Sequence, residues 1–489
     1  MLTQIEIDGF KTFKDFKVEL APFQVIVGPN GSGKSNLFDA LQLLSRLAEV
    51  DLRAAFEPSY GNPQKQRGDT YELFTRLPNG HRSDRIKIAV EMLVDRKVKD
   101  DLGSETELAY IRLRYELEII LRTGELDQLN VTHESLQSIP LEKDNWCKKY
   151  GLSHQNGWLP KSSEEQAKFI TTELAPVANF GAPSSPLNIV MKALMIQLHH
   201  EGQEITRMFR AEDIQRTVLS SITNAEYPHP FAVRQEMRSW KFLHLSYEAL
   251  RQPGPANGPS FISIDGSNLP SMLARMQRED KFALNDVSRD LANLVPDAVG
   301  VELTKDDILN RYTVWVKYMD ERSFPSSVLS DGTLRLLALA ALRNDPQFHG
   351  VLCMEEPENG VHPSTLKDIA HMLRRVATDF SDPEQVNEPL NQMLVTTHSP
   401  TFISLPDVID KLLFANSVTL VEPGEYTIQI TQMRPVVTSN SEAQLDPNTD
   451  TDETMDVYTI DQVIKYLDSQ YLNEAHEQID KVRTKMNEG

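Results

Sequence analysis

Hydrophobic and polar positions along this chain follow two periods, and their order predicts an α/β protein. Residues 2–27 alternate as strands do and end in the short, largely apolar run Phe23–Val27. From Asn36 to Ala48, apolar residues recur at helical spacing. After a stretch rich in proline, glycine and arginine, strand patterns return at Ile86–Met92 and at Tyr110–Leu121. Residues 1–130 are therefore expected to form the first half of a sheet-based domain.

The pattern changes between residues 131 and 290. Loops that contain tryptophan and proline precede two stretches with helical spacing, Leu187–His200 and Arg210–Asn224. No heptad pattern is sustained here, so long coiled-coil arms are not expected. We interpret residues 131–290 as an inserted, mainly helical subdomain.

Residues 291–436 are expected to complete the domain that residues 1–130 begin. A helix is predicted from Leu329 to about Arg343, where leucine and alanine dominate. Two short apolar runs, Val351–Met354 and Met393–Thr397, predict buried strands. Each of these strands is followed at once by polar residues, which places candidate chemistry at the strand ends.

Residues 437–489 form a fourth segment of different character. Ser439–Asp456 is polar and acidic and has no basic residue, which predicts a disordered linker. Tyr458–Met486 returns to helical spacing. Such a helix could pack back on the preceding domain or dock a partner, and the sequence leaves both alternatives open.

Composition narrows the class of protein. Of the 489 residues, 40% are hydrophobic and 25% are charged, which is ordinary for a globular protein. The net charge of −21 argues against a surface coated by nucleic acid, although a local basic groove stays compatible with it. Two cysteines, Cys147 and Cys353, are too few for a disulfide framework and favour a reducing compartment. Because no apolar run is long enough to cross a bilayer and Met1–Ile7 lacks a signal-peptide pattern, we expect a cytoplasmic protein with no membrane partner.

One stretch carries a specific chemical signal. Residues 28–35 match G-x-x-x-x-G-K-[ST] between a predicted strand and a predicted helix. In such a loop, backbone N–H groups close around phosphate oxygens at the N-terminus of the helix. Lys34 is expected to bridge the β- and γ-phosphates of a nucleoside triphosphate, and the Ser35 hydroxyl to ligate Mg²⁺. The alternative is a plain glycine turn, and the candidate nucleotide-binding residues are Gly28, Asn30, Gly31, Gly33, Lys34 and Ser35.

Two carboxylates, Glu355 and Glu356, directly follow the predicted strand Val351–Met354. Mg-ATP chemistry needs one carboxylate that holds the metal through its water shell and another that polarises the attacking water. Taken alone, the two glutamates could be a solvated turn. After a phosphate loop, they predict a hydrolytic site.

The order of the motifs indicates the class of ATPase. Lys34 and Glu355 lie too far apart in the sequence for a compact GTPase or AAA+ core. Ser330 opens a predicted helix shortly before Glu355, and His398 ends the next predicted strand. The motifs follow the order found in ABC-type ATPase heads: a phosphate loop, a long insertion, a helix that starts with serine and glycine, a strand that ends in carboxylates, and a strand that ends in histidine.

At these residues the chain resembles the RecF- and SMC-like ABC ATPases, and most closely the stand-alone predicted ATPases related to the OLD (overcoming-lysogenization-defect) proteins. The resemblance covers most of residues 1–430 and implies an ABC-type P-loop ATPase head with a mixed β-sheet core and an inserted helical subdomain. The motifs that carry it are Gly28–Ser35, Asp265–Leu269, Leu329–Arg335, Glu355–Pro363 and Thr397–Pro400.

The resemblance also implies a role for individual residues. Glu355 takes the Mg²⁺ position that is usually an aspartate, and Glu356 is the catalytic carboxylate. His398 is the switch residue that senses the γ-phosphate. Ser330 and Gly332 belong to the signature motif, which contacts the nucleotide.

One family motif is not placed by the sequence. The glutamine loop of ABC ATPases usually follows a strand, and the two glutamines that sit plausibly in the sequence are Gln64 and Gln66. Neither follows a convincing strand.

Partners are likewise implied by the family. Two heads dimerise face to face, and each ATP lies between one phosphate loop and the signature helix of the other chain. ATP binding closes the dimer and hydrolysis opens it, so that the ATPase acts as a switch on DNA or on a partner protein. The likeness extends to bacterial anti-phage ATPases such as those of Septu and PARIS, where a separate protein carries the nuclease or toxin. We therefore expect ATP, Mg²⁺, a second copy of this chain or a larger assembly, and an effector protein, with DNA as a further candidate.

Three other functions remain as alternatives. OLD proteins carry a Toprim nuclease domain after the histidine motif, and Val418–Glu422 with Asp450 and Asp452 faintly resembles its acidic residues. No apolar strand leads into that aspartate pair, and the chain after Glu422 is short for a Toprim domain. A second alternative is a DNA repair ATPase of the RecF type. A third is a nucleotide-gated scaffold that hydrolyses slowly or not at all.

Two further groups of residues, three lysines near the N-terminus and a pair of adjacent histidines, can each be interpreted as ordinary surface residues or as functional ones. Lys11, Lys14 and Lys17 could form a solvated basic face, or one of them could approach the nucleotide or DNA. His199 and His200 could suggest a metal pair, but adjacent residues of a helix point in different directions. Ordinary surface histidines are the expectation there.

Overall fold

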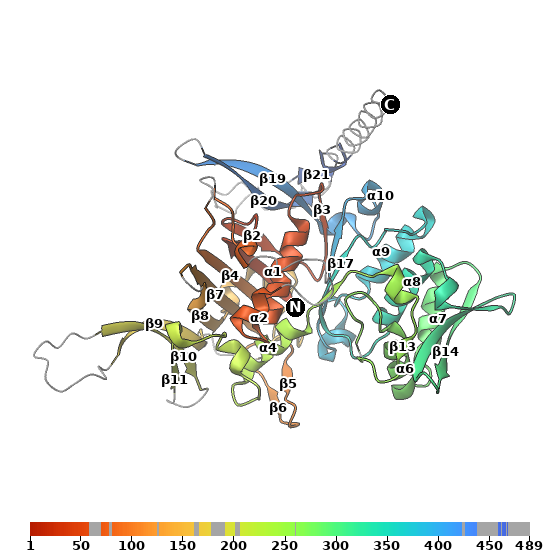
Figure 1. The fold of residues 1–489 in the computed structure, drawn as a ribbon, viewed down its shortest axis with the longest axis horizontal. Coiled ribbons are helices and arrows are strands. Elements are labelled where there is room, and N and C mark those ends of the chain that lie inside the picture. Colours follow the sequence, from red (N-terminus) through yellow and green to blue (C-terminus); the bar gives the residue numbers. More distant parts are fainter. Residues whose placement is uncertain are drawn as a thin grey trace, which may run out of the picture.

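The computed structural model describes most of the chain and shows two large sheets with helices between and beside them (Figure 1). Gln64 and Gln66, the acidic segment Ser439–Asp456 and most of the C-terminal tail lie outside the described residues. The described residues are 1–57, 70–77, 81–124, 127–160, 166–177, 191–200, 206–259, 261–422, 426–437, 458–460, 462–465 and 467.

An eight-stranded sheet forms one outer layer, and each neighbouring pair in it is antiparallel. Its order is β11-β10-β9-β8-β7-β4-β1-β2. Its inner face is apolar and its outer face polar, because buried and less buried residues alternate along the strands. The strands are β1 (Leu2–Asp8), β2 (Phe16–Glu19), β4 (Arg85–Leu93), β7 (Arg112–Arg122), β8 (Gln128–Ser138), β9 (Lys168–Val177), β10 (Met191–His199) and β11 (Thr206–Arg210).

The second sheet has seven strands in the order β12-β17-β18-β3-β19-β20-β21. Strands β12 to β19 of this order are parallel, while β19 and β20 form an antiparallel hairpin, so the sheet is mixed. The strands are β12 (Lys241–Leu243), β17 (Gly350–Glu355), β18 (Asn391–Thr397), β3 (Phe23–Val27), β19 (Leu412–Glu422), β20 (Tyr426–Val437) and β21 (Tyr458–Thr459).

Helices cover both faces of the seven-stranded sheet. Val351 and Cys353 of β17 join the core between the two sheets, whereas Leu352 and Met354 join a second core on the opposite face. The first core holds α1 (Lys34–Leu47), α2 (Leu52–Phe56), α3 (Asn145–Lys149) and α4 (Pro228–Ser239). Around the second core lie α5 (Tyr247–Leu250), α6 (Leu269–Glu279), α7 (Ala283–Leu294), α8 (Asp331–Arg343), α9 (Leu366–Arg374) and α10 (Pro400–Ile403). Figure 1 accordingly shows α1 and α8 on opposite sides of β17.

Two small sheets complete the described strands. One is built on the hairpin β14 (Ala298–Asp306) and β15 (Arg311–Tyr318), with β13 (Gly254–Pro255) and β16 (Ser323–Pro325) also paired to β15. The other is the hairpin β5 (Lys97–Lys99) and β6 (Glu105–Glu107).

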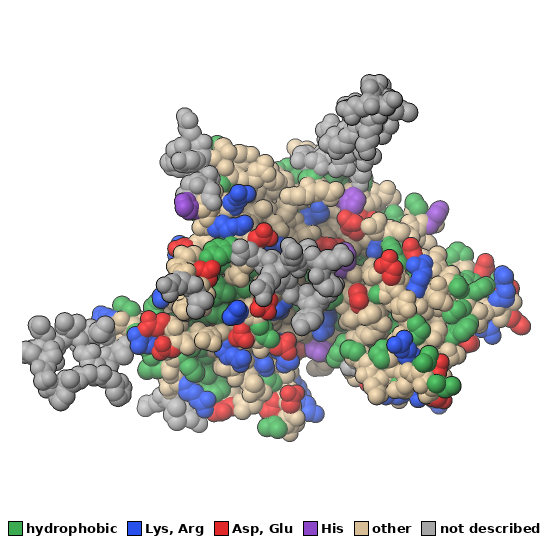
Figure 2. All heavy atoms as spheres, in the orientation of Figure 1, with side chains coloured by type: hydrophobic (Ala, Val, Ile, Leu, Met, Phe, Trp, Pro, Cys, Tyr) green, Lys and Arg blue, Asp and Glu red, His purple; other side chains and the backbone are tan. Residues whose placement is uncertain are grey.

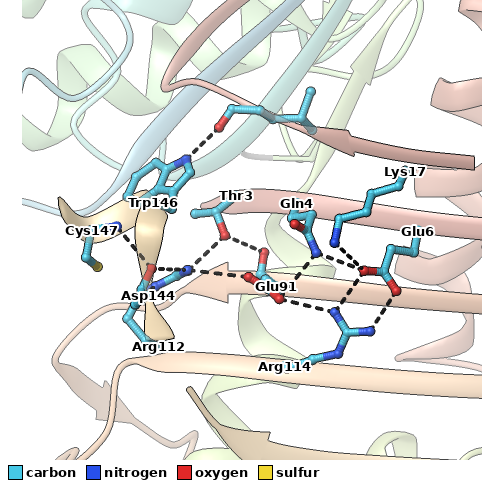
Figure 3. Close-up of polar contacts among 11 residues, drawn as sticks. Thr3, Gln4, Glu6, Lys17, Glu91, Arg112, Arg114, Asp144, Trp146 and Cys147 are labelled. Carbon is cyan, nitrogen blue, oxygen red and sulfur yellow. Dashed lines mark hydrogen bonds and ion pairs between the residues drawn. The ribbon is translucent and has the colours of Figure 1, made fainter. Parts of the chain in front are cut away.

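A polar network lies on the eight-stranded sheet (Figure 3). The Arg114 guanidinium contacts the carboxylates of Glu6, Glu91 and Glu116 at 2.7, 3.1 and 2.6 Å. The Arg112 guanidinium is buried and pairs with Asp144, 2.6 Å from Nε to Oδ2. Since Asp144 also accepts a hydrogen bond from the backbone N–H of residue 147, it caps α3 and fixes that helix against the sheet.

Most elements expected around the site are confirmed. Phe23–Val27 is β3, and the helix predicted from Asn36 is α1. The predicted strands at Ile86–Met92, Tyr110–Leu121, Val351–Met354 and Met393–Thr397 are β4, β7, β17 and β18. The helix predicted from Leu329 to Arg343 is α8. The fold is thus α/β, with a mixed central sheet and helices on both of its faces.

Two predicted helices are wrong. In the stretch Leu187–His200, the described residues form strand β10, which pairs with β9 and β11. Leu194, Ile196 and Leu198 lie two residues apart, as a strand requires, but Leu194 and Leu198 also fit the four-residue spacing of a helix. The stretch Arg210–Asn224 holds only two single-turn 3₁₀ helices, at residues 211–213 and 219–221.

These corrections change the picture of residues 131–290. Strands β9 to β11 extend the eight-stranded sheet, so the first part of this segment is not mainly helical, whereas α4, α6 and α7 lie in its second part. The division into 1–130, 131–290, 291–436 and 437–489 stays a prediction. Of the tail, Val463 and Leu467 are buried in the second core, which favours packing on the head for this first helical turn.

Two expectations about the cysteines and the membrane can be compared with the structure. Cys147 and Cys353 are both free and buried. In the described part of the chain, no helix has the length and apolarity that a membrane span needs.

Candidate functional site

The phosphate loop joins the carboxyl end of β3 to the start of α1, as the sequence predicts. Its glycines are required by close approaches and by backbone conformation. A Cβ on Gly28 would lie 2.2 Å from the carbonyl oxygen of Ala415, and a Cβ on Gly33 would lie 1.9 Å from Thr431 Oγ1. Gly33 also has φ +92°, in the left-handed region that favours glycine. Asn30 and Gly31 lie at the exposed tip of the loop.

Lys34 is folded back on the loop. Its Nζ donates hydrogen bonds to the backbone carbonyls of Gly28 (2.7 Å) and Pro29 (2.8 Å). Burial lowers the pKa of Lys34 to about 8, although the negative charges of Glu356, Glu355 and Glu358 act in the opposite direction. A half-buried ammonium whose hydrogen bonds within the described ranges go to carbonyl oxygens is a ready partner for phosphate.

Ser35 and Glu355 meet across the site. Ser35 Oγ donates a hydrogen bond of 2.6 Å to Glu355 Oε1. Glu355 is the last residue of β17, and Ser35 lies in the first turn of α1. The parallel order of β17, β18 and β3 brings the carboxyl ends of these strands to one edge, which is where ligands bind in open α/β sheets.

Glu356 is held in a defined position. Its φ of +47° is unusual for a residue with a side chain, and its backbone N–H donates to the carbonyl of Thr396 (2.8 Å). Its Oε1 lies 3.0 Å from Nδ1 of His398, and its Oε2 accepts a hydrogen bond of 3.0 Å from Asn359 Nδ2. The two predicted catalytic residues, Glu356 and His398, are therefore in contact.

A third carboxylate, Glu358, lies in the same loop. Its Oε1 accepts a hydrogen bond from the hydroxyl of Thr397, while its buried Oε2 has no hydrogen-bond partner within the described ranges. Burial raises the pKa of Glu358. Ser32 Oγ in the phosphate loop is likewise buried without a partner among the described residues. Polar atoms left unpaired at a buried site are typical of a position that a ligand completes.

Ser330 and Gly332 lie elsewhere, at the start of α8. Ser330 caps this helix by accepting a hydrogen bond of 3.2 Å from the backbone N–H of Thr333. A Cβ on Gly332 would lie 2.8 Å from the carbonyl oxygen of Gly360, so α8 packs closely on the loop after β17. Within the described part of the chain, no polar contact joins Ser330 or Gly332 to the phosphate loop.

The residues present fit Mg²⁺ with a nucleotide. Ser35 and Glu355 supply the hard oxygen ligands that Mg²⁺ prefers, and Mg²⁺ commonly uses one or two protein groups together with phosphate oxygens and water. No group of three or more His, Cys, Asp or Glu side chains in the described ranges could hold a metal by itself. A nucleotide would have to complete the coordination.

Two residues of the site are not predicted from the sequence. Arg335 interrupts the apolar pattern of α8, and its Nη1 donates to the backbone carbonyls of Glu356 (2.7 Å) and Asn359 (2.9 Å). His244 follows the three-residue strand β12, which is too short to detect, and its Nδ1 lies 3.8 Å from Glu355 Oε2. A single charged residue within an apolar helix is the one available signal for Arg335.

Other candidate residues have contacts within the fold. Lys11 pairs with Asp39 of α1, and Lys17 lies 3.2 Å from Glu6. His199 lies in β10 and its Nε2 is 2.8 Å from Thr171 Oγ1, while His200 contacts the ring of Tyr227. Figure 2 shows acidic and basic side chains interspersed on the face in view, with no single basic patch.

Two models of protein families match the chain. Residues 1–184 match "AAA ATPase domain", and residues 209–404 match "AAA domain, putative AbiEii toxin, Type IV TA system". The first match contains the phosphate loop, and the second contains Ser330, Glu355, Glu356 and His398.

Among curated proteins, the chain is similar to two that bear the name chromosome partition protein Smc. Identity is 30% over 115 residues with the protein of Bordetella petrii and 47% over 55 residues with that of Methanocaldococcus jannaschii. These alignments span 23% and 11% of this chain, and only 9% and 5% of the relatives' lengths.

Solved structures similar to this one include heads of SMC proteins. The SmcHead bound to the C-winged helix domain of ScpA has a TM-score of 0.44 at 12% identity, with 88% of this chain and 97% of that chain covered. The SMC head domain from Thermotoga maritima has a TM-score of 0.37 at 12% identity, with 89% and 99% covered. Together with the phosphate loop and the carboxylate strand, the family matches support an ATPase of the AAA and SMC type.

Proposed function

We propose that this protein is an ATP-binding and ATP-hydrolysing switch, whose two copies close on each other around ATP and thereby control a partner effector. One observation carries the proposal. Ser35 Oγ donates a hydrogen bond of 2.6 Å to Glu355 Oε1, and in the next residue Glu356 Oε1 lies 3.0 Å from Nδ1 of His398. Residues from the ends of β17 and β18 and from the start of α1 thus converge at the phosphate loop. This is the arrangement that Mg-ATP hydrolysis needs.

Each group has a chemical role in the proposed reaction. Lys34 would exchange its two carbonyl partners for phosphate oxygens, and the N–H groups at the start of α1 would add to the binding of the anion. Mg²⁺ bound by Ser35 and Glu355 supplies charge compensation for the triphosphate. The Glu356 carboxylate, oriented by Asn359, accepts the proton of the attacking water. His398 would contact the γ-phosphate while its Nδ1 stays close to Glu356.

Dimerisation is proposed because the signature residues lie away from the chain's own phosphate loop. Ser330 presents a helix N-terminus, which suits phosphate, yet the hydrogen bonds given for its side chain in the described residues go to Thr333. The neighbouring Asp331 is fixed by Arg251 at 2.5 Å, so this end of α8 is held in place. A second chain could bring Ser330 and Gly332 onto the nucleotide.

The effector is proposed from the resemblance to OLD-type and anti-phage ATPases, and the family description that mentions a toxin system agrees with it. A bacterial defence role is therefore favoured over DNA repair of the RecF type. An intrinsic Toprim nuclease has less support: Val418–Glu422 is part of the long hairpin of β19 with β20, and Asp450 and Asp452 lie outside the described residues.

A mixing experiment tests the shared site. Ser330→Arg should leave nucleotide binding to one chain nearly intact but abolish hydrolysis, since a bulky cation there blocks closure. Lys34→Ala should be inactive because it does not hold ATP. When the two inactive proteins are mixed, one site of each mixed dimer has an intact phosphate loop and an intact Ser330. Phosphate release should then return, to at most about half of the wild-type rate per mixed dimer if the sites act independently.

ATP-dependent dimerisation of each variant should be measured by light scattering in parallel. If Ser330→Arg alone hydrolyses ATP at the wild-type rate, the shared site is wrong and one chain works by itself.

A further inference from the structure

A cavity of about 180 Å³ opens beside Ser35 and Glu355, and His244 lines it. Its wall on one side is α1, and on the other it is the edge strand β12 with the residues directly after it. His244 is the first residue after β12, which pairs with β17 in parallel. The strands β12 and β17 therefore end side by side, and His244 and Glu355 face each other at this edge.

The carboxylate of Glu355 has a neighbour on each oxygen. Oε1 accepts the hydrogen bond from Ser35, and Oε2 lies 3.8 Å from His244 Nδ1. The Ser35 hydroxyl, the Glu355 carboxylate and the His244 imidazole therefore lie close enough together to bind one ion. All three side chains come from ends of regular elements, which place them precisely enough for coordination of one ion.

Stability does not explain this position of His244. Its side chain is 82% exposed, and an ion pair of 3.8 Å at an exposed position contributes little to folding. The backbone is nevertheless fixed, because the N–H of His244 donates a hydrogen bond of 2.8 Å to the carbonyl of Ile264. The ring can turn toward the cavity while its anchor stays in place.

We propose that His244 is a nitrogen ligand of the cation that accompanies the nucleotide, and that it makes the site select divalent first-row transition ions, represented by Mn²⁺, over Mg²⁺. Imidazole suits first-row transition ions such as Fe²⁺, Ni²⁺ and Zn²⁺ best, and Mn²⁺, although it favours oxygen, accepts a nitrogen ligand more readily than Mg²⁺ does. Two protein oxygens, one imidazole nitrogen and phosphate oxygens form a ligand set that Mn²⁺ accepts. This inference rests on the proposed binding of nucleotide at residues 28–35.

Pulsed electron paramagnetic resonance tests the contact directly. The full-length protein, labelled with ¹⁵N only at histidine, is loaded with Mn²⁺ and a non-hydrolysable ATP analogue. The labelled imidazole should give a ¹⁵N coupling to the Mn²⁺ ion, which adenine and backbone nitrogens cannot produce. The coupling should vanish in His244→Ala and in His244→Gln.

His349→Ala is the matched control. His349 is an exposed histidine just before the opposite, amino end of β17, where its Nδ1 lies 3.1 Å from the carbonyl of Gln347. This variant should keep the coupling. Titration with the analogue should show affinity about tenfold weaker in His244→Ala when Mn²⁺ is the cation, and less than about threefold weaker with Mg²⁺.

The outcomes separate this inference from the proposed function. A wild-type complex that binds the Mn²⁺ nucleotide without a ¹⁵N coupling overturns the role of His244 and leaves the nucleotide site standing. A coupling that persists in His244→Ala has the same consequence, as does an equal loss of affinity with both cations. Failure of the wild-type protein to bind any nucleotide overturns both proposals together.

Discussion

Two polar clusters of this molecule use the same residue types in opposite ways. On the eight-stranded sheet, Arg112 pairs with Asp144, and Arg114 contacts Glu6 and Glu91 (Figure 3). A third carboxylate, that of Glu116, also contacts Arg114. At the carboxyl edge of the seven-stranded sheet, Lys34 stands near three carboxylates too, but its hydrogen bonds go to backbone carbonyls. In the first cluster each arginine forms ion pairs with carboxylates. In the second cluster the hydrogen bonds of the Lys34 ammonium go to carbonyl oxygens and not to the nearby carboxylates.

Two glutamates, Glu134, which is buried, and Glu358, which is half-buried, show the same contrast. Glu134 on β8 accepts hydrogen bonds from the backbone N–H groups of Val218 (2.7 Å) and Leu219 (2.8 Å) and from the hydroxyl of Tyr115 (3.1 Å). Glu358 accepts one from Thr397, and its second oxygen has no partner among the described residues. Burial raises the pKa of both carboxyls. A polar group whose hydrogen bonds are complete stabilises the fold, whereas one with an unpaired atom marks a position where a ligand could bind.

The largest effect is expected from Lys34→Ala. Removing the ammonium deletes charge-assisted hydrogen bonds to phosphate, which should weaken ATP binding by about 3 kcal/mol or more, at least about a hundredfold. Thermal unfolding should change little, because Lys34 has only carbonyl partners to lose. Titration with a fluorescent ATP analogue measures the affinity. If this variant bound ATP with wild-type affinity, the Lys34 cluster would not be a nucleotide site and its contrast with the Arg112 and Arg114 cluster would have no functional meaning.

Asp144→Ala should do the reverse. It leaves the buried guanidinium of Arg112 without its main partner and removes the cap of α3, which should lower the free energy of unfolding by about 3–5 kcal/mol. ATP affinity should stay at the wild-type value. Arg114→Ala is the matched control, and since Arg114 is partly exposed it should cost only about 1 kcal/mol. Chemical denaturation measures both, and equal costs would contradict the distinction between buried and exposed pairs.

A smaller effect, on the pH dependence of stability, is expected from substitution of Glu134. Burial raises its pKa from 4.5 to about 7, so the folded state keeps a proton that the unfolded chain releases in this window. The contribution of Glu134 to stability is therefore full at pH below this window and is lost as the pH rises through it. In Glu134→Gln, the fall in unfolding free energy between about pH 5 and pH 8 should shrink by about 2 kcal/mol. Denaturation at several pH values shows it, and an unchanged pH slope would speak against the effect.

The sequence predicts the phosphate loop and the carboxylates because both obey local rules. Val351–Met354 is apolar enough to be a buried strand, and the residues directly after such a strand in a parallel sheet must lie at its carboxyl edge. The partners of those carboxylates are not local. Arg335 and His244 reach the site through tertiary contacts that no spacing encodes, and only Asn359 contacts Glu356 from within the same loop.

The wrong prediction at β10 has a related cause. In β10, apolar residues satisfy the strand period and the helix spacing at once, and pairing with β9 and β11 decides between them. That pairing depends on residues distant in the sequence. The same limit hides β12, whose three residues become a strand only beside β17.

Glu356→Gln gives the most direct test of the central claim, that this sheet edge hydrolyses ATP. Glutamine keeps the size of the side chain and an oxygen that can accept from Asn359, but it cannot take a proton from water. The variant should bind ATP with wild-type affinity and release phosphate at least about a hundredfold more slowly in a single-turnover assay. Phosphate release at the wild-type rate would contradict the account, because another group would then be the base.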